Sequence, residues 1–179
     1  LTTAVDAKDS YTARHSLGVT DVAHRIGEEL QLSAEEMTVL ERASLLHDIG
    51  KIGVSEVILL KPSALTDEEF TRIKEHPETG ARILETIPFL EDVVPIVRYH
   101  HERWDGGGYP GVLAGEDIPM LARILTVADA YDALTTARPY RGAMQAAEAL
   151  VEVRRNAGTQ FDRIVVAALD AALGTRTTG

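Results

Sequence analysis

Apolar side chains recur at helical spacing along most of the chain. Between positions 11 and 30, Val19, Ile26 and Leu30 fall on one helix face, and His15 lies on the same stripe. No alternation of apolar and polar residues is long enough to indicate a strand. The pattern therefore predicts an all-α fold.

Capping residues divide this pattern into separate helices. Ser33 and Glu36 form a capping box that opens a helix ending at His47, and Thr66 with Glu69 repeats the signature before a shorter helix. Further helices are expected through Ile83 and Ile87 after the His76-Pro77 break, from 91 to 101, from 120 to 134, from 143 to 157 and from 162 to 173. We expect a single-domain helical bundle of about seven helices over 1–179, with 1–10 as a linker from an N-terminal module and 174–179 as a flexible tail.

Composition limits the compartment and the partners. The 179 residues with 45% hydrophobic content suit one domain. No apolar run approaches the roughly 20 residues of a membrane span, and the opening LTTAVDAKDS lacks the features of a secretion signal, so we expect a cytoplasmic protein. A net charge of −10 argues against a general nucleic-acid binder. Because the chain has no cysteine, any metal must be held by His, Asp or Glu.

Histidines and aspartates gather where the predicted helices end or face inward. Only His24, among six histidines, points to the opposite side of its helix. The candidate metal ligands are His15, His47, Asp48, His76, His100, His101 and Asp129. Imidazoles and carboxylates without thiolates suit iron, manganese, zinc or magnesium. Seven candidates exceed the needs of one ion, which favours a two-metal centre of the kind that cleaves phosphoesters.

The stretch YHHERWDGGGYPG at 99–111 joins a histidine pair to a glycine-rich loop. Neighbouring helical residues differ by about 100° in direction, so His100 and His101 can serve different ions or coordination positions. The glycines let the backbone approach a ligand, and Pro110 stiffens the exit. Taken alone, the loop is also compatible with an ordinary flexible connection, and each histidine with a structural role.

Together these stretches resemble the HD-GYP family, a bacterial branch of the HD metal-dependent phosphohydrolases. The resemblance rests on LLHDIGKIGV at 45–54, LKPSALTDEEFTRIKEHPETGARIL at 60–84, the loop at 99–111, IPMLARILTVADAYDALTTARPYR at 118–141 and AGTQFD at 157–162. It implies a helical bundle that hydrolyses the second messenger cyclic di-GMP to linear pGpG, with further cleavage to GMP left open. The family's metal ligands match the seven candidates.

A mechanism follows as a hypothesis. We expect Asp48 to bridge the two metals, and a hydroxide held between them to attack phosphorus. Lys51, one helical turn beyond His47, would meet a phosphate or assist the leaving oxygen. The remaining expected roles are substrate contacts by Gly108, Tyr109, Arg138 and Arg141, and orientation of the loop or of ligating imidazoles by Glu102, Asp105 and Asp132.

The resemblance also implies a metal count and partners. Members with three metals have a Glu one turn before the first ligand histidine, whereas Tyr11 stands here, so we expect two divalent ions, iron or manganese before zinc or magnesium. The implied partners are cyclic di-GMP, diguanylate cyclase (GGDEF) domains and an N-terminal regulatory domain, without a nucleic-acid polymer or a membrane. A homodimer is left open. The alternatives are a catalytically weak or silent module that binds a cyclic dinucleotide or a protein, and an HD phosphohydrolase acting on another nucleotide, including a mixed guanine-adenine cyclic dinucleotide.

Overall fold

The described part of the chain is built from helices. The computed structural model describes residues 12–61, 63–137 and 142–174. Its helices are α2 (Thr12–Glu29), α3 (Ala34–Leu46), α4 (Glu56–Leu59), α5 (Asp67–Ile73), α6 (His76–Leu84), α7 (Val94–Tyr99), α8 (Met120–Thr135), α9 (Ala146–Arg155) and α10 (Arg163–Gly174), with short 3-10 helices η1 (Ile49–Gly53), η2 (Pro88–Leu90) and η3 (Gly115–Asp117). Within these ranges the only β-type pairing is one isolated bridge between Ala157 and Phe161. The expected all-α fold is confirmed.

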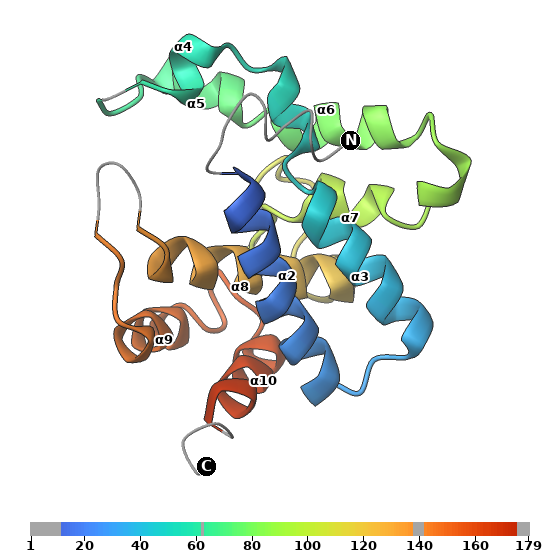
Figure 1. The fold of residues 1–179 in the computed structure, drawn as a ribbon, viewed down its shortest axis with the longest axis vertical. Coiled ribbons are helices and arrows are strands. Elements are labelled where there is room, and N and C mark those ends of the chain that lie inside the picture. The colour runs from blue at the N-terminus through green and yellow to red at the C-terminus, as the bar shows by residue number, and fades with distance from the viewer. Residues whose placement is uncertain (1–11, 62, 138–141, 175–179) are drawn as a thin grey trace.

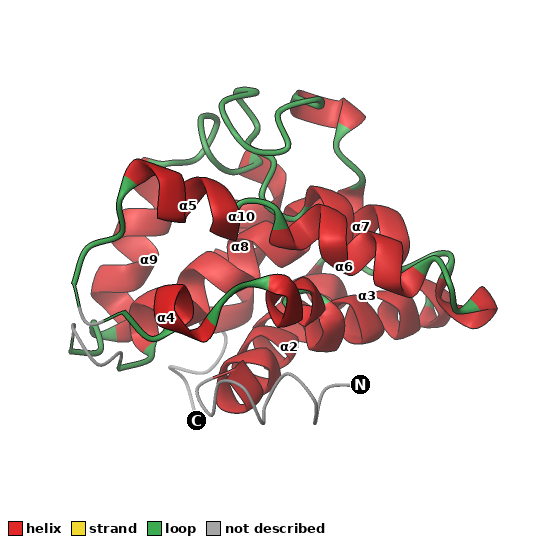
Figure 2. Ribbon diagram, turned by 90° about the horizontal axis from the view of Figure 1, so that it is seen from above, coloured by secondary structure: helices red, strands yellow, loops and turns green. Residues whose placement is uncertain are grey.

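Helix α2 runs through the centre of the bundle. It packs against α3, α8 and α10, while α6 packs against α7 and η1 (Figure 1). The apolar stripe expected from the sequence faces inward, since Val19 and Ile26 are fully buried and meet a core that includes Leu40, Ile124 and Leu125. Loops gather on the side of the bundle opposite to α2 (Figure 2). This packing places the inner face of α2 beside the ends of the other helices.

The helix boundaries follow local signals. Both capping boxes, at Ser33 and at Thr66, are formed. The sequence suggested that helix α6 continues through Ile87, but it ends at Leu84. The reason is that Ile87 precedes a proline and is extended (φ −119°, ψ 101°). Helix α9 begins at Ala146, three residues later than expected.

Four short elements, α4 and the 3-10 helices η1, η2 and η3, were not expected from the sequence, so the described residues form more helical elements than the seven expected. Helix α4 and the 3-10 helix η1 span four and five residues, which is too short for a helical hydrophobic period to be visible. In the part of the chain that the structure describes, no helix combines the length and the apolar character needed to cross a bilayer. Some of the expected features lie outside the described residues, namely the linker at 1–10, Tyr11, Arg138, Arg141 and positions 175–179 of the tail. Gly174, expected to begin the tail, is the last residue of α10.

Candidate metal centre

Three histidines at helix ends share one hydrogen-bond pattern. Each ring Nδ1 donates to the carbonyl three residues earlier, His47 to Ser44 at 2.7 Å, His76 to Ile73 at 2.8 Å and His100 to Val97 at 2.6 Å. The Nε2 atoms of the same rings are buried and have no hydrogen-bond partner among the described residues. A ring that donates through Nδ1 keeps a lone pair on Nε2, which is the form that binds a metal.

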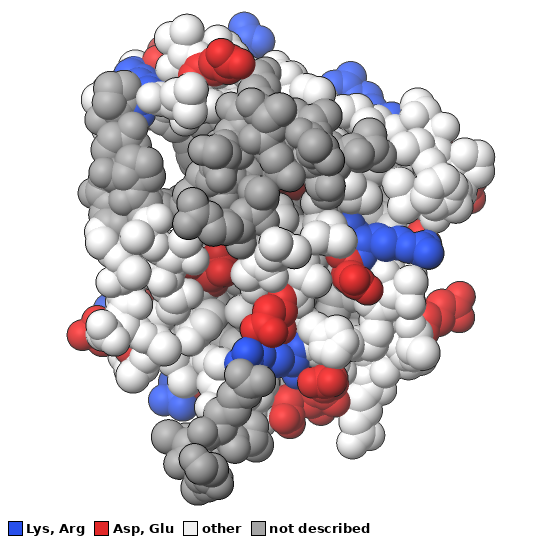
Figure 3. Space-filling view, in the orientation of Figure 1, with Lys and Arg blue, Asp and Glu red and all other residues white. Residues whose placement is uncertain are grey.

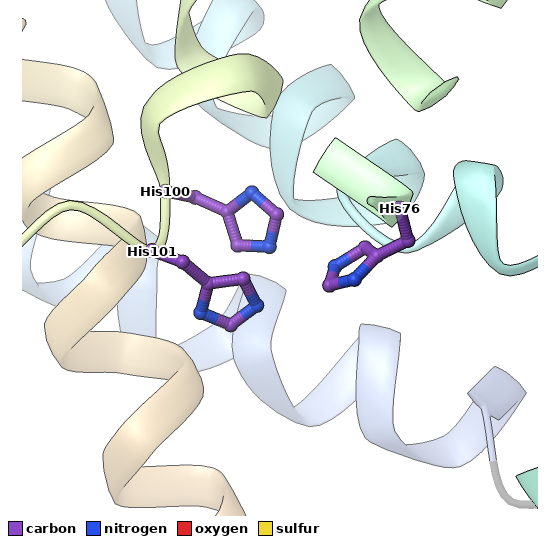
Figure 4. Close-up of side chains that lie close together, drawn as sticks. All are labelled: His76, His100 and His101. Atoms are coloured by element: carbon purple, nitrogen blue, oxygen red, sulfur yellow. The ribbon is translucent and has the colours of Figure 1, made fainter. Parts of the chain in front are cut away.

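One group of ligand atoms comes from α6 and the end of α7. A nitrogen from each of His76, His100 and His101 lies within 4.8 Å of the others, and Figure 4 shows the three rings facing one another. Desolvation lowers the pKa of His76 and His100, and it lowers that of His101 to about 3. These imidazoles are therefore neutral at physiological pH and able to accept a cation.

A second group comes from α2 and the end of α3. Atoms of His15, His47 and Asp48 also lie within 4.8 Å of one another. Asp48 faces both groups, because its Oδ2 is 3.5 Å from His47 Nε2 and its Oδ1 is 3.4 Å from His76 Nε2. Asp48 could therefore contribute to ions held at either group.

Asp48 reaches this position because η1 packs closely on α6. A Cβ atom on Gly50 would collide with the carbonyl oxygen of His76, so a glycine is needed there. Lys51 Nζ lies 2.6 Å from Asp48 Oδ2. Burial opposes ionisation of Asp48, but Lys51 and the neighbouring imidazoles outweigh it and hold the pKa of this carboxyl well below its usual value. Asp48 is consequently an anion.

His15 lies between two carboxylates of α8. Its Nε2 is 3.0 Å from Asp129 Oδ1 and its Nδ1 is 2.6 Å from Asp132 Oδ2. Burial alone would lower the pKa of His15, but the hydrogen bonds to both aspartates raise it to about 9. The same contact holds the pKa of Asp129 below its usual value, although desolvation opposes this. A cation bound by His15 and Asp129 would take the place of the Nε2 proton and leave Asp132 as the acceptor for Nδ1.

The glycine loop places an aromatic ring beside the histidines. The ring of Tyr109 lies 4.6 Å from that of His101, with 31° between the ring planes. Desolvation raises the pKa of Tyr109, so the phenol is neutral. Gly108 packs on the backbone of 101–103, and the Tyr109-Pro110 bond is cis. Tyr109 and Gly108 thus lie at the histidine groups, where substrate contacts were expected.

The other residues singled out in the sequence lie in the glycine loop, on the outer face of α2, or outside the described residues. Glu102 and Asp105 both accept hydrogen bonds from loop N–H groups, so both orient the loop. His24 is exposed on α2, pointing away from the centre as the helical phase predicts. Arg138 and Arg141 lie outside the described residues.

The donor set fits divalent metal ions. Buried ring nitrogens without a partner are costly, and they are paired in nearly all folded proteins. Here three such atoms converge beside ionised Asp48 and Asp129. Imidazole and carboxylate donors without sulfur suit iron, manganese or zinc.

Sequence reasoning missed residues that support the centre. The Thr126 hydroxyl on α8 donates 2.7 Å to the carbonyl oxygen of His100, and it also bonds the Ala122 carbonyl. The partly buried Arg123 and the buried Asp162 form an ion pair at 2.7 Å. The only sequence signal for Thr126 is a hydroxyl within an otherwise apolar stretch of helix.

These features define a class, that of all-α proteins with a buried histidine-aspartate centre suited to divalent metals. The chain belongs to the HD domain family, whose model matches residues 2–165. The resemblance to HD-GYP phosphohydrolases that the sequence suggested is thereby confirmed.

Relatives carry names of cyclic dinucleotide phosphodiesterases. The chain is 41% identical over 94% of its length to the cyclic di-GMP phosphodiesterase response regulator RpfG of Xanthomonas campestris, and 39% identical over 94% to a cyclic di-GMP phosphodiesterase of Vibrio cholerae. It is 41% identical over 94% to a 3'3'-cGAMP-specific phosphodiesterase of Vibrio cholerae. The chain spans only 45%, 37% and 37% of these three proteins.

Solved structures share the fold. An HDG"Y"P protein from Bdellovibrio bacteriovorus has a TM-score of 0.73 at 22% identity, covering 91% of this chain and 52% of that one. A cyclic GMP-AMP specific phosphodiesterase of Vibrio cholerae has a TM-score of 0.69 at 22% identity, covering 90% of this chain and 44% of that one.

Proposed function

We propose that this chain is the catalytic domain of a metal-dependent phosphodiesterase that opens cyclic di-GMP to linear pGpG, and that can continue to GMP. The observation that carries the proposal is the convergence of buried, lone-pair-bearing His47, His76 and His100 on ionised Asp48, with Tyr109 alongside. Relatives at about 40% identity that are named for this activity support it.

Seven residues would hold the ions. We assign His76, His100 and His101 to one group and His15, His47 and Asp129 to the other, with Asp48 shared between them. Two divalent ions, iron or manganese before zinc or magnesium, would provide an activated water molecule and neutralise charge on the phosphate. The count of two rests on Tyr11 standing where three-metal members have Glu.

The chain's own groups then position the substrate. Lys51, held at Asp48, presents an ammonium group that can meet a phosphate oxygen or protonate the leaving oxygen. Tyr109 offers an aromatic face beside the histidines. Arg138 and Arg141 match family positions that contact the substrate phosphate or base, and guanidinium groups there would offset the chain's net charge of −10.

The net charge and the proposed substrate support further proposals on partners and compartment. We propose a cytoplasmic setting, where cyclic di-GMP is made and read, an N-terminal regulatory domain, and contact with GGDEF domains through the glycine loop. A homodimer is left open. On the face shown in Figure 3, acidic and basic side chains of the described residues are interspersed, which gives no continuous basic surface there for a nucleic-acid polymer.

A second candidate substrate is the mixed guanine-adenine cyclic dinucleotide. It is favoured by the relative named 3'3'-cGAMP-specific phosphodiesterase, which is as similar to this chain as the relative named for cyclic di-GMP. The same metal centre would serve either substrate, because both are cyclic phosphodiesters.

The test combines metal analysis with product chromatography. Protein purified without oxygen and loaded with iron or manganese is expected to hold two metals per chain and to convert cyclic di-GMP to pGpG. A panel with the mixed dinucleotide and nucleoside triphosphates ranks the substrates. Metal-loaded protein that hydrolyses none of these nucleotides would indicate a binding module. Three metals per chain would refute the proposed number of two.

A further inference from the structure

Glu102 follows the histidine pair but belongs to neither group of ligand atoms. Its side chain is buried, with 1% exposed. Oε1 accepts hydrogen bonds from three consecutive N–H groups, those of Gly111 at 3.0 Å, Val112 at 2.9 Å and Leu113 at 3.3 Å. Since these residues directly follow Pro110, the carboxylate anchors the exit of the glycine loop.

The loop is also fixed at the residues before this exit. The N–H of Tyr109 donates to the carbonyl oxygen of His101 at 3.1 Å. A Cβ atom on Gly108 would lie 2.5 Å from that oxygen and from the Arg103 backbone nitrogen. The loop at Gly108 therefore packs directly against the backbone of 101–103. The position of the Tyr109 ring over His101 therefore depends on how residues 108–113 are held.

The second oxygen of Glu102 faces a different neighbour. Oε2 is buried without a hydrogen-bond partner among the described residues, and the same holds for Arg123 Nε. Both side chains line one small cavity with Trp104 and Asp162, in which the space open to the centre of a water molecule is about 10 Å³. That is room for about one water molecule, and a water molecule there would accept from Nε–H and donate to the carboxylate.

The far side of this cavity is held by an ion pair. Arg123 Nη1 pairs at 2.7 Å with Oδ2 of Asp162, the residue that directly precedes α10. One turn further along α8, Thr126 holds the His100 carbonyl oxygen at 2.7 Å. Helix α8 is thus connected both to the histidine pair and, across the cavity, to Glu102.

We propose that Glu102 is a positioning residue that, together with one water molecule shared with Arg123, holds Tyr109 against His101 and so fixes the substrate-facing wall of the metal centre. The kinetic part of this inference rests on the proposed function. The positional part does not, because it is read from the loop itself.

The chain contains its own reporter for the loop. Trp104 is the only tryptophan, it lines the same cavity, and the Arg123 guanidinium lies 5.7 Å from its ring. Quenching of its fluorescence by acrylamide therefore measures how tightly this segment is packed, whether or not the protein is active.

The decisive variant is Glu102→Gln, which keeps the size of the side chain. The amide is a weaker acceptor than the carboxylate, and its NH₂ group at the Oε2 position cannot accept from the water that Arg123 holds. We expect stronger acrylamide quenching of Trp104 and a KM for cyclic di-GMP raised about tenfold, the size of one charge-assisted hydrogen bond. The metal content and kcat should match the parent.

Glu116→Gln is the matched control, because it removes the same charge from an exposed side chain in the connection between α7 and α8. It should leave quenching and KM unchanged. Arg123→Lys keeps a cation for Asp162 but removes the Nε–H, and it should shift both readouts in the direction of Glu102→Gln by a smaller amount.

Several results would overturn the proposal. These are parent-like quenching in Glu102→Gln, a changed quenching without a change in KM, a parallel loss of metal, or an equal effect of Glu116→Gln. A parent protein that binds metal but hydrolyses no cyclic dinucleotide would instead refute the proposed function. In that case the quenching comparison still decides whether Glu102 and Arg123 hold the loop.

Discussion

The two halves of the centre differ in that one half holds a charged imidazole, that of His15, and the other holds neutral ones. On the side of α6 and α7, desolvation lowers the pKa of His100 and brings that of His101 to about 3. On the side of α2, His15 is also buried, yet hydrogen bonds to Asp129 and Asp132 overcome its desolvation and raise its pKa to about 9. Burial is common to both halves, so the difference comes from the carboxylates.

This difference shows two ways to prepare a cation site. In the first half, Nδ1 bonds to helix carbonyls leave neutral rings whose lone pairs are ready for a metal. In the second half, the His15 imidazolium is itself the cation between two carboxylates. A metal entering the first half displaces no proton, whereas one entering the second half must expel the proton from His15. Asp48 touches both halves.

The largest expected effect comes from removing the residue that the halves share. Asp48→Ala should reduce both metal content and turnover of cyclic di-GMP to background, because His47 and His76 would lose their anionic neighbour. Circular dichroism should show unchanged helix content, since the Asp48 side chain caps no helix. Metal analysis and product chromatography measure the loss.

Asp21→Ala is the control for Asp48→Ala, as it removes an exposed carboxylate of α2 that only pairs with Arg25. It should retain metal and activity. Parent-like turnover in Asp48→Ala would show that the two halves work without a shared carboxylate.

The second effect concerns the stability of the metal-free protein between pH 6.5 and 9. Because the folded pKa of His15 lies above its unfolded value, its stabilisation is complete below pH 6.5 and is lost as pH rises through about 9. A shift of this size corresponds to about 3 kcal/mol in the free energy of unfolding. His101 has the opposite sign, since its lowered pKa costs stability as pH falls from 6.5 towards about 3.

Urea unfolding in the presence of a chelator measures this dependence. The parent should lose stability between pH 6.5 and 9, and His15→Asn should lose much less over the same interval. Equal slopes for the two proteins would mean that His15 is not a cation between the aspartates.

A smaller effect is expected from Asp132→Asn, which acts on one half only. The Asp132 carboxylate accepts from His15 Nδ1 at 2.6 Å, and loss of such an outer partner typically lowers metal affinity about 10–100-fold. Chelator competition should therefore show one weakened ion and one that is unchanged. An equal weakening of both ions would mean that the halves are not independent.

The helices and the convergence of the histidines in both halves could be predicted from local sequence patterns. The helices follow from apolar spacing and capping boxes, and the histidines converge because they lie at helix ends or on an inward stripe, as with His47 and His15. The charge of His15 was not foreseeable, because it depends on Asp132, which is 117 positions away. The pairing of Arg123 with Asp162 spans 39 positions and likewise exists only once α8 and α10 are packed.

The smallest effect is expected at His24, which tests whether the helical phase of α2 assigns its two histidines correctly. Nine positions separate His24 from His15, and the His24 side chain is 53% exposed and lies 3.6 Å from Glu28. Exposed pairs at this spacing contribute about 0.2–0.5 kcal/mol at most. His24→Ala should therefore retain the metal content, turnover and melting temperature of the parent. Loss of metal in this variant would place His24, and not His15, on the face of α2 that meets α8, and would remove the charged half of the centre from the comparison.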